Sequence, residues 1–244
     1  SESACTGNLY TGMCEFNEMG FLIHFLKIND VFVDIGANSG AYTVLASKVI
    51  GARSICIEPI NQAIIRVKEH LKINQIQNLV ELHNIGLGNN EEQVTFTTDK
   101  DSTNHVLPYS SPSNLNTILQ NVKTLDSILN FREEYILKID TEGYEFNILK
   151  GASKILKNGN ILAIIIEVNG SGNRYGFTNK HIHDELNSYG YIPIEYDPKS
   201  KKIDNCKNLN ENINYIYVKD IKLAINRINN SKSYKIRSNN DYCI

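Results

Sequence analysis

Short apolar runs alternate along the chain with longer segments in which apolar residues recur at the spacing of a helix. This alternation is typical of βαβ units built around a parallel sheet. The pattern predicts strands at 31–35, 54–58, 80–84, 136–140, 161–168, 192–196 and 215–218. It predicts helices at 15–26, 41–50, 61–73, 125–130, 145–156 and 181–189. The sequence therefore predicts an α/β fold with seven strands.

One long segment, 88–121, interrupts the alternation. It contains a hairpin-like stretch at 93–98, followed by a polar part rich in Ser, Asn and Pro. A loop of this length inside a compact domain is usually either functional or disordered. We expect it to face the substrate.

The length of 244 residues suits one substantial domain and is too short for two full domains with separate cores. We expect a helical segment at 1–30 packed on a domain at 31–218, followed by a tail at 219–244. Between residues 219 and 237 of this tail, Asp220 is the sole acidic residue among Lys219, Lys222, Arg227, Lys232, Lys235 and Arg237. A solvated terminal helix is the favoured interpretation of this basic tail, and an anion-binding face is the alternative.

Composition and charge argue against several classes of protein. Hydrophobic residues make up 41% and charged residues 21%, which is typical of a packed globular domain. The net charge of −2 argues against a strong nonspecific hold on nucleic acid. The longest apolar run, 161–166, is too short to cross a bilayer, and no basic segment followed by an apolar stretch begins the sequence. The five cysteines are scattered without a C-x-x-C pair, so we expect reduced thiols in a cytoplasmic protein with no membrane span.

The first predicted strand runs into a glycine-rich turn, Asp34-Ile-Gly-Ala-Asn-Ser-Gly40, and then into a helix. Glycine lets the backbone approach a ligand closely, and the start of the helix offers free N–H groups. Ligands of such folds lie outside the carboxyl ends of the strands. A glycine turn alone is a weak signal, because many strand-to-helix turns use glycine only for their geometry.

A second feature strengthens this interpretation. Glu58 ends the second predicted strand, 22 residues after Gly36, where an acidic residue can accept hydrogen bonds from a ribose diol. The alternative is a surface glutamate at a strand end. Asn84 ends the third predicted strand, before Ile85 and Gly86, and an adenine edge can be recognised there. The turn is not a full G-x-G-x-x-G and no Walker lysine follows it, which disfavours NAD-dependent and phosphate-transferring enzymes.

Four motifs occur in a specific order: Asp34 to Thr43, then Ile57-Glu-Pro59, then Lys138-Ile-Asp-Thr-Glu-Gly-Tyr-Glu145 with Leu149-Lys-Gly-Ala152, and finally Ile165-Ile-Glu167. Together they resemble the FkbM family of methyltransferases, over roughly residues 18–196. The resemblance implies a class I (Rossmann-like) fold, with a seven-stranded, mostly parallel sheet whose last strand runs antiparallel. It also implies transfer of a methyl group from S-adenosylmethionine to oxygen, with a hydroxyl of a sugar, glycan or small metabolite as acceptor.

The resemblance also assigns positions to the cofactor. Asp34, Gly36, Asn38 and Gly40 would line its methionine end, and Glu58 would hold its ribose. The whole predicted cofactor set comprises Asp34, Gly36, Ala37, Asn38, Gly40, Tyr42, Thr43, Glu58, Pro59, Asn84, Ile85, Gly86 and Asp140.

Transfer to a hydroxyl requires alignment of the acceptor and removal of its proton. Asp140 ends the fourth predicted strand, and Glu142 and Glu145 follow around Gly143. Acids this close raise one another's pKa, which suits a base at neutral pH. We predict catalytic roles for Asp140 and Glu142, whereas Glu145 is better explained by the favourable position of an acid at the start of a helix.

Other interpretations stay open. His181, with His183 beside it at a helix start, is a further candidate base. Asp140, Glu167 and Asn169 place oxygen ligands on two strand ends and could hold Mg²⁺, although a divalent cation is not favoured.

Two alternative functions also remain. An RNA ribose methyltransferase is disfavoured because the chain has neither a spaced Lys-Asp-Lys-Glu tetrad nor an Asn-Pro-Pro-Tyr motif, and no overall basic charge. A non-catalytic interaction module is disfavoured because Gly36, Gly40 and Glu58 are all intact.

Overall fold

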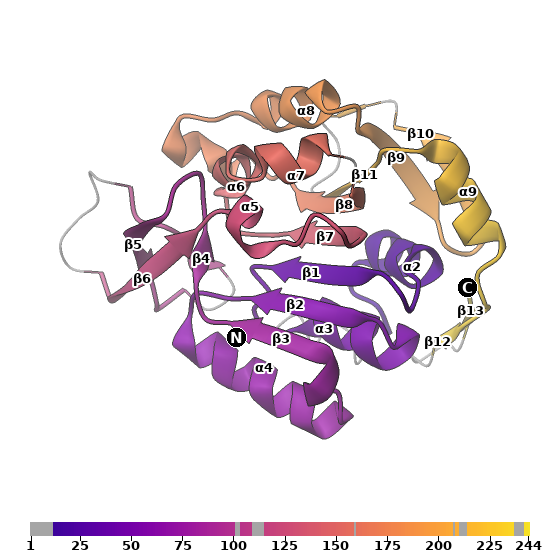
Figure 1. The fold of residues 1–244 in the computed structure, drawn as a ribbon, viewed down its shortest axis with the longest axis horizontal. Coiled ribbons are helices and arrows are strands. Elements are labelled where there is room, and N and C mark those ends of the chain that lie inside the picture. The colour runs from indigo at the N-terminus through magenta and orange to yellow at the C-terminus, as the bar shows by residue number, and fades with distance from the viewer. Residues whose placement is uncertain are drawn as a thin grey trace.

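The computed structural model describes residues 12–100, 103–108, 115–158, 160–206, 208–209, 214–236 and 242–244. Within these residues the main sheet has eight strands in the order β10-β9-β11-β8-β7-β1-β2-β3 (Figure 1). Its strands are β1 (Val31–Ile35), β2 (Arg53–Ile57), β3 (Val80–His83), β7 (Tyr135–Ile139), β8 (Ile161–Glu167), β9 (Ile192–Asp197), β10 (Lys202–Asn205) and β11 (Asn214–Val218). The strands from β3 to β8 pair in parallel, whereas β11 runs antiparallel to both β8 and β9.

The predicted fold class is confirmed, including the antiparallel direction of the last predicted strand. One difference is the eighth strand, β10, which pairs with the edge strand β9. The sequence pattern does not predict β10, because its residues are polar except for the half-buried Ile203.

The central strands β1 and β7 are buried along their whole length, as expected for parallel strands covered on both faces. Two charged residues break their apolar pattern, Asp34 in β1 and Lys138 in β7. They are direct neighbours in the register of the two strands. A buried charge requires a partner, so this pair marks a functional or structural centre.

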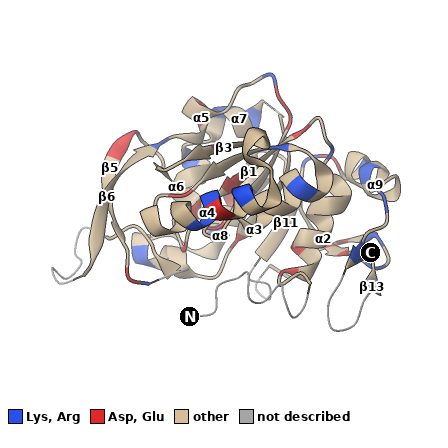
Figure 2. Ribbon diagram, turned by 90° about the horizontal axis from the view of Figure 1, so that it is seen from below, with Lys and Arg blue, Asp and Glu red and all other residues tan. Residues whose placement is uncertain are grey.

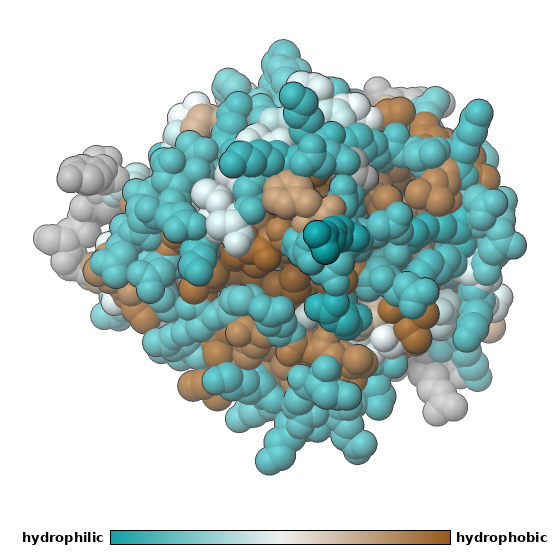
Figure 3. All heavy atoms as spheres, in the orientation of Figure 1, coloured by the Kyte–Doolittle hydropathy of each residue, from teal (hydrophilic) through white to brown (hydrophobic). Residues whose placement is uncertain are grey.

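Helices cover both faces of the sheet (Figure 1). They are α2 (Phe16–Phe25), α3 (Ala41–Val44), α4 (Asn61–Asn74), α5 (Leu125–Ile128), α6 (Glu145–Lys150), α7 (Ser153–Lys157), α8 (Asn179–Ser188) and α9 (Ile221–Asn229). One apolar core joins α5 to α8 with one face of the sheet, and a second joins α2 and α9 with the other. The outer surface is mostly hydrophilic, with hydrophobic residues gathered near the middle of the face seen in Figure 3.

Two predicted helices differ from the structure. The helix predicted at 41–50 begins as α3 and widens to a π-helical turn at Leu45–Ile50. The helix predicted at 145–156 is divided into α6 and α7 at Gly151. A side chain at Gly151 would place its Cβ 2.0 Å from the Gly88 backbone oxygen, so the close passage of another segment accounts for the glycine that ends α6.

The segment predicted as a long loop contains a small sheet. Strands β4 (Gly86–Leu87), β5 (Glu92–Thr97) and β6 (Thr117–Lys123) form it in the order β4-β6-β5, and β5 and β6 are antiparallel. The polar residues of β6 hide its alternation of half-buried and exposed positions. Residues 101–102 and 109–114 of this segment lie outside the described residues.

The basic tail forms α9, whose basic residues are visible in Figure 2. The helix is not only solvated, because Ala224 and Ile228 are buried against the core. Arg227 also has acidic partners from elsewhere in the chain, with Asp30 at 2.5 Å and Glu134 at 3.3 Å. Arg237, and residues 1–11 at the other end, lie outside the described residues. No helix among the described ranges is long and apolar enough to cross a membrane.

Candidate active site

The turn after β1 has three residues with left-handed backbone: Gly36 with φ 76°, Asn38 with φ 49° and Gly40 with φ 75°. A side chain at position 36 cannot be accommodated, because its Cβ would lie 1.8 Å from the Asp140 backbone oxygen. Glycine is therefore required where the turn passes the end of β7.

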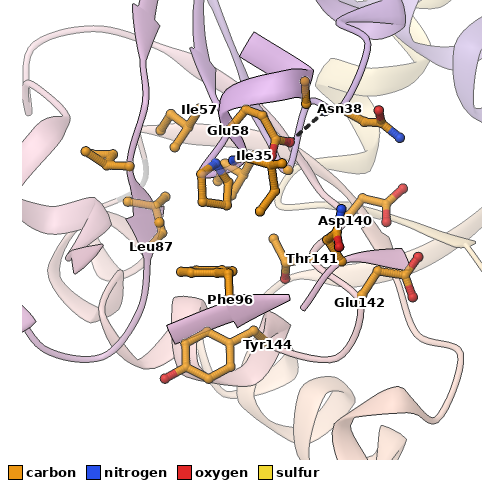
Figure 4. A pocket seen from close by; sticks show the side chains of 17 residues that line it. Ile35, Asn38, Ile57, Glu58, Leu87, Phe96, Asp140, Thr141, Glu142 and Tyr144 are labelled. Carbon is orange, nitrogen blue, oxygen red and sulfur yellow. Dashed lines mark hydrogen bonds between the residues drawn. The ribbon is translucent and has the colours of Figure 1, made fainter. Parts of the chain in front are cut away.

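Glu58 follows β2 and ties the turn to it. The side chain is 5% exposed, and its two oxygens accept hydrogen bonds from the backbone N–H groups of Asn38 (2.9 Å) and Ile60 (2.8 Å). Figure 4 shows the contact to Asn38. Burial raises the pKa of Glu58 to about 7, although the two N–H donors oppose the rise. The alternative of a surface glutamate is therefore wrong.

Asp34 has a similar role on the other side of the turn. Its Oδ2 accepts hydrogen bonds from the backbone N–H (2.9 Å) and the hydroxyl (2.6 Å) of Thr43. Both residues are buried, and burial raises the pKa of Asp34 to about 6 against the effect of the two donors. Asp34 thus fixes the start of α3 relative to β1.

A first cavity, which we call the apolar cavity, lies between the turn and the small sheet (Figure 4). It is lined by Ile35, Gly36, Asn38, Ile57, Glu58, Pro59, Ile60, Ala63, Ile85, Gly86, Leu87, Phe96, Asn104, Asp140, Thr141, Glu142 and Tyr144. Apolar side chains form most of its wall, and Glu58, Asp140 and Glu142 add carboxylates. An apolar slot with a few fixed polar groups suits a nucleoside.

A second cavity of about 210 Å³, the acidic cavity, lies on the other side of the turn. It is lined by Cys14, Glu15, Met19, Asp34, Gly36, Ala37, Asn38, Ser39, Ala41, Tyr42, Lys138, Asp140, Glu142 and Glu167. Both cavities include Gly36, Asn38, Asp140 and Glu142, so they adjoin beneath the glycine turn.

Three carboxylates converge in the acidic cavity. Asp140, Glu142 and Glu167 each place an oxygen within 4.8 Å of the others. Glu142 has left-handed backbone, with φ 56°, which is uncommon for a non-glycine residue and frequent at functional sites. Burial and the neighbouring Asp140 raise the pKa of Glu142 to about 7 and that of Glu167 to about 9. One cavity therefore contains a carboxyl group, Glu142, that can gain or lose a proton near neutral pH and another, Glu167, that keeps its proton there.

Lys138 places the balancing positive charge beside these acids. Its Nζ lies 3.1 Å from Asp140 Oδ2. Burial by itself would lower the pKa of Lys138, but the carboxylates of Asp140 and Glu15 outweigh burial and raise it. The sequence interpretation missed this residue, although a lysine within the buried run of β7 was a usable signal.

Several predicted cofactor residues support the site without lining it. Thr43 is fully buried behind Asp34. Asn84 donates hydrogen bonds from Nδ2 to the backbone oxygens of Glu58 and Pro59, both at 3.0 Å. Gly40 serves as the left-handed N-cap of α3. Sequence reasoning also missed Phe96 and Tyr144, which lie on the wall of the apolar cavity away from Glu58 (Figure 4).

The candidate histidines lie elsewhere in the described structure. His181 lines neither cavity, and its Nδ1 accepts a hydrogen bond from the Thr178 backbone N–H (2.9 Å) at the start of α8. His183 is buried and paired with the Tyr217 hydroxyl. This placement does not favour the predicted role of His181 as a base.

Glu145 has the structural role expected of it. Its Oε1 accepts hydrogen bonds from the backbone N–H groups of Thr141 (2.9 Å) and Gly143 (3.0 Å) at the start of α6. Asn169, a predicted metal ligand, accepts a hydrogen bond from the Ser171 backbone N–H at 2.8 Å. This hydrogen bond holds the Asn169 oxygen in the turn after β8, and the acidic residue that lies beside Asp140 and Glu167 is Glu142.

Residues 34–193 match the model of the methyltransferase FkbM domain, which is more than half of the 244 residues. The chain belongs to the FkbM methyltransferase family. It is an S-adenosylmethionine-dependent methyltransferase, as the sequence motifs predicted. No curated protein sequence matches the chain.

Solved structures with a similar arrangement include the precorrin-6y C5,15-methyltransferase of Geobacter metallireducens GS-15, with 16% identity and a TM-score of 0.47 over 86% of this chain and 89% of that one. Another is SMU.1697c of Streptococcus mutans, provisionally assigned as a methyltransferase and solved in complex with S-adenosylhomocysteine (SAH). It has 16% identity and a TM-score of 0.47 over 82% of this chain and 93% of that one. A third is an rRNA methylase of Streptococcus thermophilus, with 15% identity and a TM-score of 0.43 over 82% and 91%. Likenesses at these TM-scores carry no inference about the acceptor.

Proposed function

We propose that this FkbM-family enzyme transfers a methyl group to a hydroxyl oxygen of a sugar, a glycan or another small polar metabolite. The observation that carries the proposal is the convergence of Asp140, Glu142 and Glu167 in a cavity that adjoins the glycine turn. A hydroxyl attacks a methyl group efficiently only when it is aligned with that group and loses its proton. Carboxylates can align the hydroxyl by accepting its hydrogen bond, and they can also accept its proton.

S-adenosylmethionine, when bound, supplies an electrophilic methyl group on a positively charged sulfur. The apolar cavity suits its nucleoside, and Phe96 and Ala63 in the wall would hold the base. Glu58 can bind the ribose diol, because each carboxylate oxygen that accepts one backbone N–H retains capacity for a second hydrogen bond. The glycine turn and Asp34, which line the acidic cavity, would hold the methionine end.

The protein's own residues can manage the acceptor proton. Glu142 is half-buried, and its raised pKa of about 7 makes it a suitable base at neutral pH. Asp140, fixed by Lys138, can accept a hydrogen bond that aligns the hydroxyl. Glu167, with its pKa raised to about 9, retains a proton at neutral pH and can donate a hydrogen bond to the acceptor.

The charge of the site supports a neutral or positively charged acceptor. Beside the acidic cavity lies an outer groove of about 880 Å³, bounded by residues 14–18 and by strands β9, β10 and β11. Its charged lining residues are Glu15, Glu18, Glu195, Asp197, Asp204 and Lys202. Such a surface repels phosphates, whereas its carboxylates can accept hydrogen bonds from a polyol. This disfavours RNA ribose as the acceptor.

A methyl-transfer assay with labelled cofactor tests the proposal. The array would contain free sugars, amino sugars, nucleotide sugars, glycans and a structured RNA, with Glu142→Gln enzyme as a control for nonspecific labelling. We expect label in a sugar or other small hydroxyl compound. Label in RNA alone would contradict the proposed acceptor class.

A further inference from the structure

Lys138 occupies an unusual position for a lysine. Its side chain is 3% exposed at the centre of the sheet, on the fully buried strand β7. A buried ammonium group is strongly destabilising unless its donors are paired. The partners of Lys138 therefore indicate what the residue is for.

Three groups surround the ammonium, which has three hydrogens to donate. Asp140 Oδ2 and Asn214 Oδ1 each lie 3.1 Å from Nζ, and Glu15 Oε2 lies at 3.5 Å. The Tyr42 ring centroid is 5.3 Å away, and the Tyr42 hydroxyl donates to the same Glu15 oxygen at 2.5 Å. Lys138 and Tyr42 thus hold the Glu15 carboxylate from two sides.

These partners come from distant parts of the chain. Asp140 lies within the family-matched residues 34–193, but Glu15 precedes them at the start of α2 and Asn214 follows them at the start of β11. Asn214 is also opposite Glu167 in the register of β11 and β8. One ammonium therefore joins the family-matched part of the site to two flanking segments.

The flanking residues lie where the acidic cavity meets the outer groove. Glu15 lines both, and Asn214 lines the groove. An acceptor larger than the acidic cavity must pass this boundary to bring its hydroxyl to Glu142. Glu15 can accept a hydrogen bond from such an acceptor, because Oε1 is not the oxygen held by Tyr42 and Lys138.

We propose that Lys138 is a positioning residue that fixes Asp140 at the methyl-transfer site and anchors Glu15 and Asn214 as the wall that selects the acceptor. The proposal rests on the proposed function and adds the residues that set its specificity. The competing explanation is that Lys138 only stabilises the sheet as a counterion.

The experiment compares Lys138→Met, Glu15→Gln and the double variant. Lys150→Met is the matched control, because Lys150 forms an exposed ion pair with Glu185 outside both cavities. Hydrogen–deuterium exchange would be followed in peptides covering residues 12–22, and kinetics would use the acceptor methylated best in the array. Should Lys138→Met fail to fold, Glu15→Gln removes the same ion pair from its more exposed end.

We expect Lys138→Met to accelerate exchange in residues 12–22 by about tenfold or more. Without the ammonium, fewer contacts have to break before this segment opens locally. Its kcat should fall about 100-fold while the KM for S-adenosylmethionine changes little, since misplacing a reacting group lowers turnover. Glu15→Gln should raise the acceptor KM about tenfold with little change in kcat. The acceptor KM of the double variant should not exceed that of Lys138→Met, because both substitutions remove the same ion pair between Lys138 and Glu15.

Wild-type exchange in residues 12–22 together with wild-type kinetics in both single variants would overturn the proposal. So would equal losses in every kinetic constant that follow a fall in melting temperature, since those indicate a counterion alone. If no compound in the array is methylated although SAH binds by calorimetry, the proposed acceptor class fails. Exchange then decides the inference by itself: acceleration confined to residues 12–22, at unchanged SAH affinity, supports it, whereas unchanged exchange, or acceleration spread through the strands of the sheet, overturns it.

Discussion

The apolar and acidic cavities adjoin beneath one glycine turn, but different kinds of contact shape them. On the apolar side, buried carboxylates accept hydrogen bonds from backbone N–H groups close in the fold, as Glu58 does from Asn38 and Ile60. On the acidic side, a buried lysine holds side chains from residues 15, 140 and 214. Hydrogen bonds to backbone N–H groups do not depend on the side chains of the donor residues, so many sequences can form the same cavity. Contacts between side chains change whenever one of the residues is substituted. The first kind of contact suits a cofactor that is always the same, and the second suits an acceptor that differs between enzymes.

The largest effect is expected from Gly36→Ala, which places a Cβ against the Asp140 backbone oxygen. The turn and the end of β7 must separate, so SAH binding should be lost by calorimetry. Gly190→Ala is the matched control, because Gly190 also has positive φ (83°) but no atom within 4 Å of the added Cβ. It should show only the strain of the left-handed backbone, as a modest fall in melting temperature. Equal SAH affinity in both variants would contradict the close approach.

The next effect concerns the carboxylates where the two cavities adjoin. Asp140→Asn and Glu142→Gln should each lose about 100-fold or more in kcat, because an aligning or proton-accepting carboxylate is removed. Their affinity for SAH should equal that of a control variant, Glu81→Gln, because Glu81 is an exposed residue of the edge strand β3. Near-normal turnover in both amide variants would move the catalytic role to another residue, with Glu167, the third carboxylate of the cluster, next to be replaced.

Glu58→Ala tests the apolar side and should be milder. Removing a charge-assisted pair of hydrogen bonds should weaken SAH binding by about 1.5 to 3 kcal/mol. Because Glu58 also ties the turn to β2, exchange at Asn38 and Ile60 should accelerate as well. Glu58→Gln, which keeps one acceptor oxygen, should lie between the alanine variant and the native enzyme. Unchanged affinity in Glu58→Ala would remove this residue from the cofactor site.

The pH dependence of turnover offers a finer test. A base acts only when deprotonated, and burial and Asp140 raise the pKa of Glu142 to about 7. The kcat should therefore be constant between about pH 7 and the pKa of Glu167, about 9, and fall about tenfold for each unit below pH 7. The dependence should disappear in Glu142→Gln. A profile that stays flat from pH 5 to 8 in the native enzyme would contradict the assignment of the base.

The smallest effect is expected from EDTA. The Lys138 ammonium already neutralises part of the carboxylate cluster, so chelation should leave turnover unchanged. Loss of activity with EDTA, restored by Mg²⁺, would instead indicate a metal ion. In that case Glu167→Gln should be as damaging as Asp140→Asn.

Local sequence patterns sufficed for one side of the site. The glycine turn, Glu58 and the strand ends lie within contiguous motifs, because the βαβ unit brings neighbouring segments together. Elements with polar faces were harder to predict. Strand β6, for example, has exposed polar residues at Thr117 and Asn121. The break between α6 and α7 could not be predicted locally, because it depends on the approach of Gly88 to Gly151 in the folded chain.

The acidic side required the tertiary structure. Nothing near Lys138 in the sequence indicates that residues 15 and 214 lie beside it, because these contacts span the whole chain. The carboxylates of this side were predicted from their motifs, as Asp140, Glu142 and Glu167 each follow or end a predicted strand. The charged residue within the apolar run of β7 was the one local signal for their link to residues 15 and 214.

The position of Phe96 has a practical consequence for spectroscopy. The chain contains no tryptophan, and Phe96 lies in the wall of the apolar cavity with 6% of its side chain exposed. Phe96→Trp would therefore introduce a single indole whose emission can be excited apart from the tyrosines. A nucleoside entering the cavity would quench or shift that emission, and the enzyme would report occupancy in real time without any acceptor present.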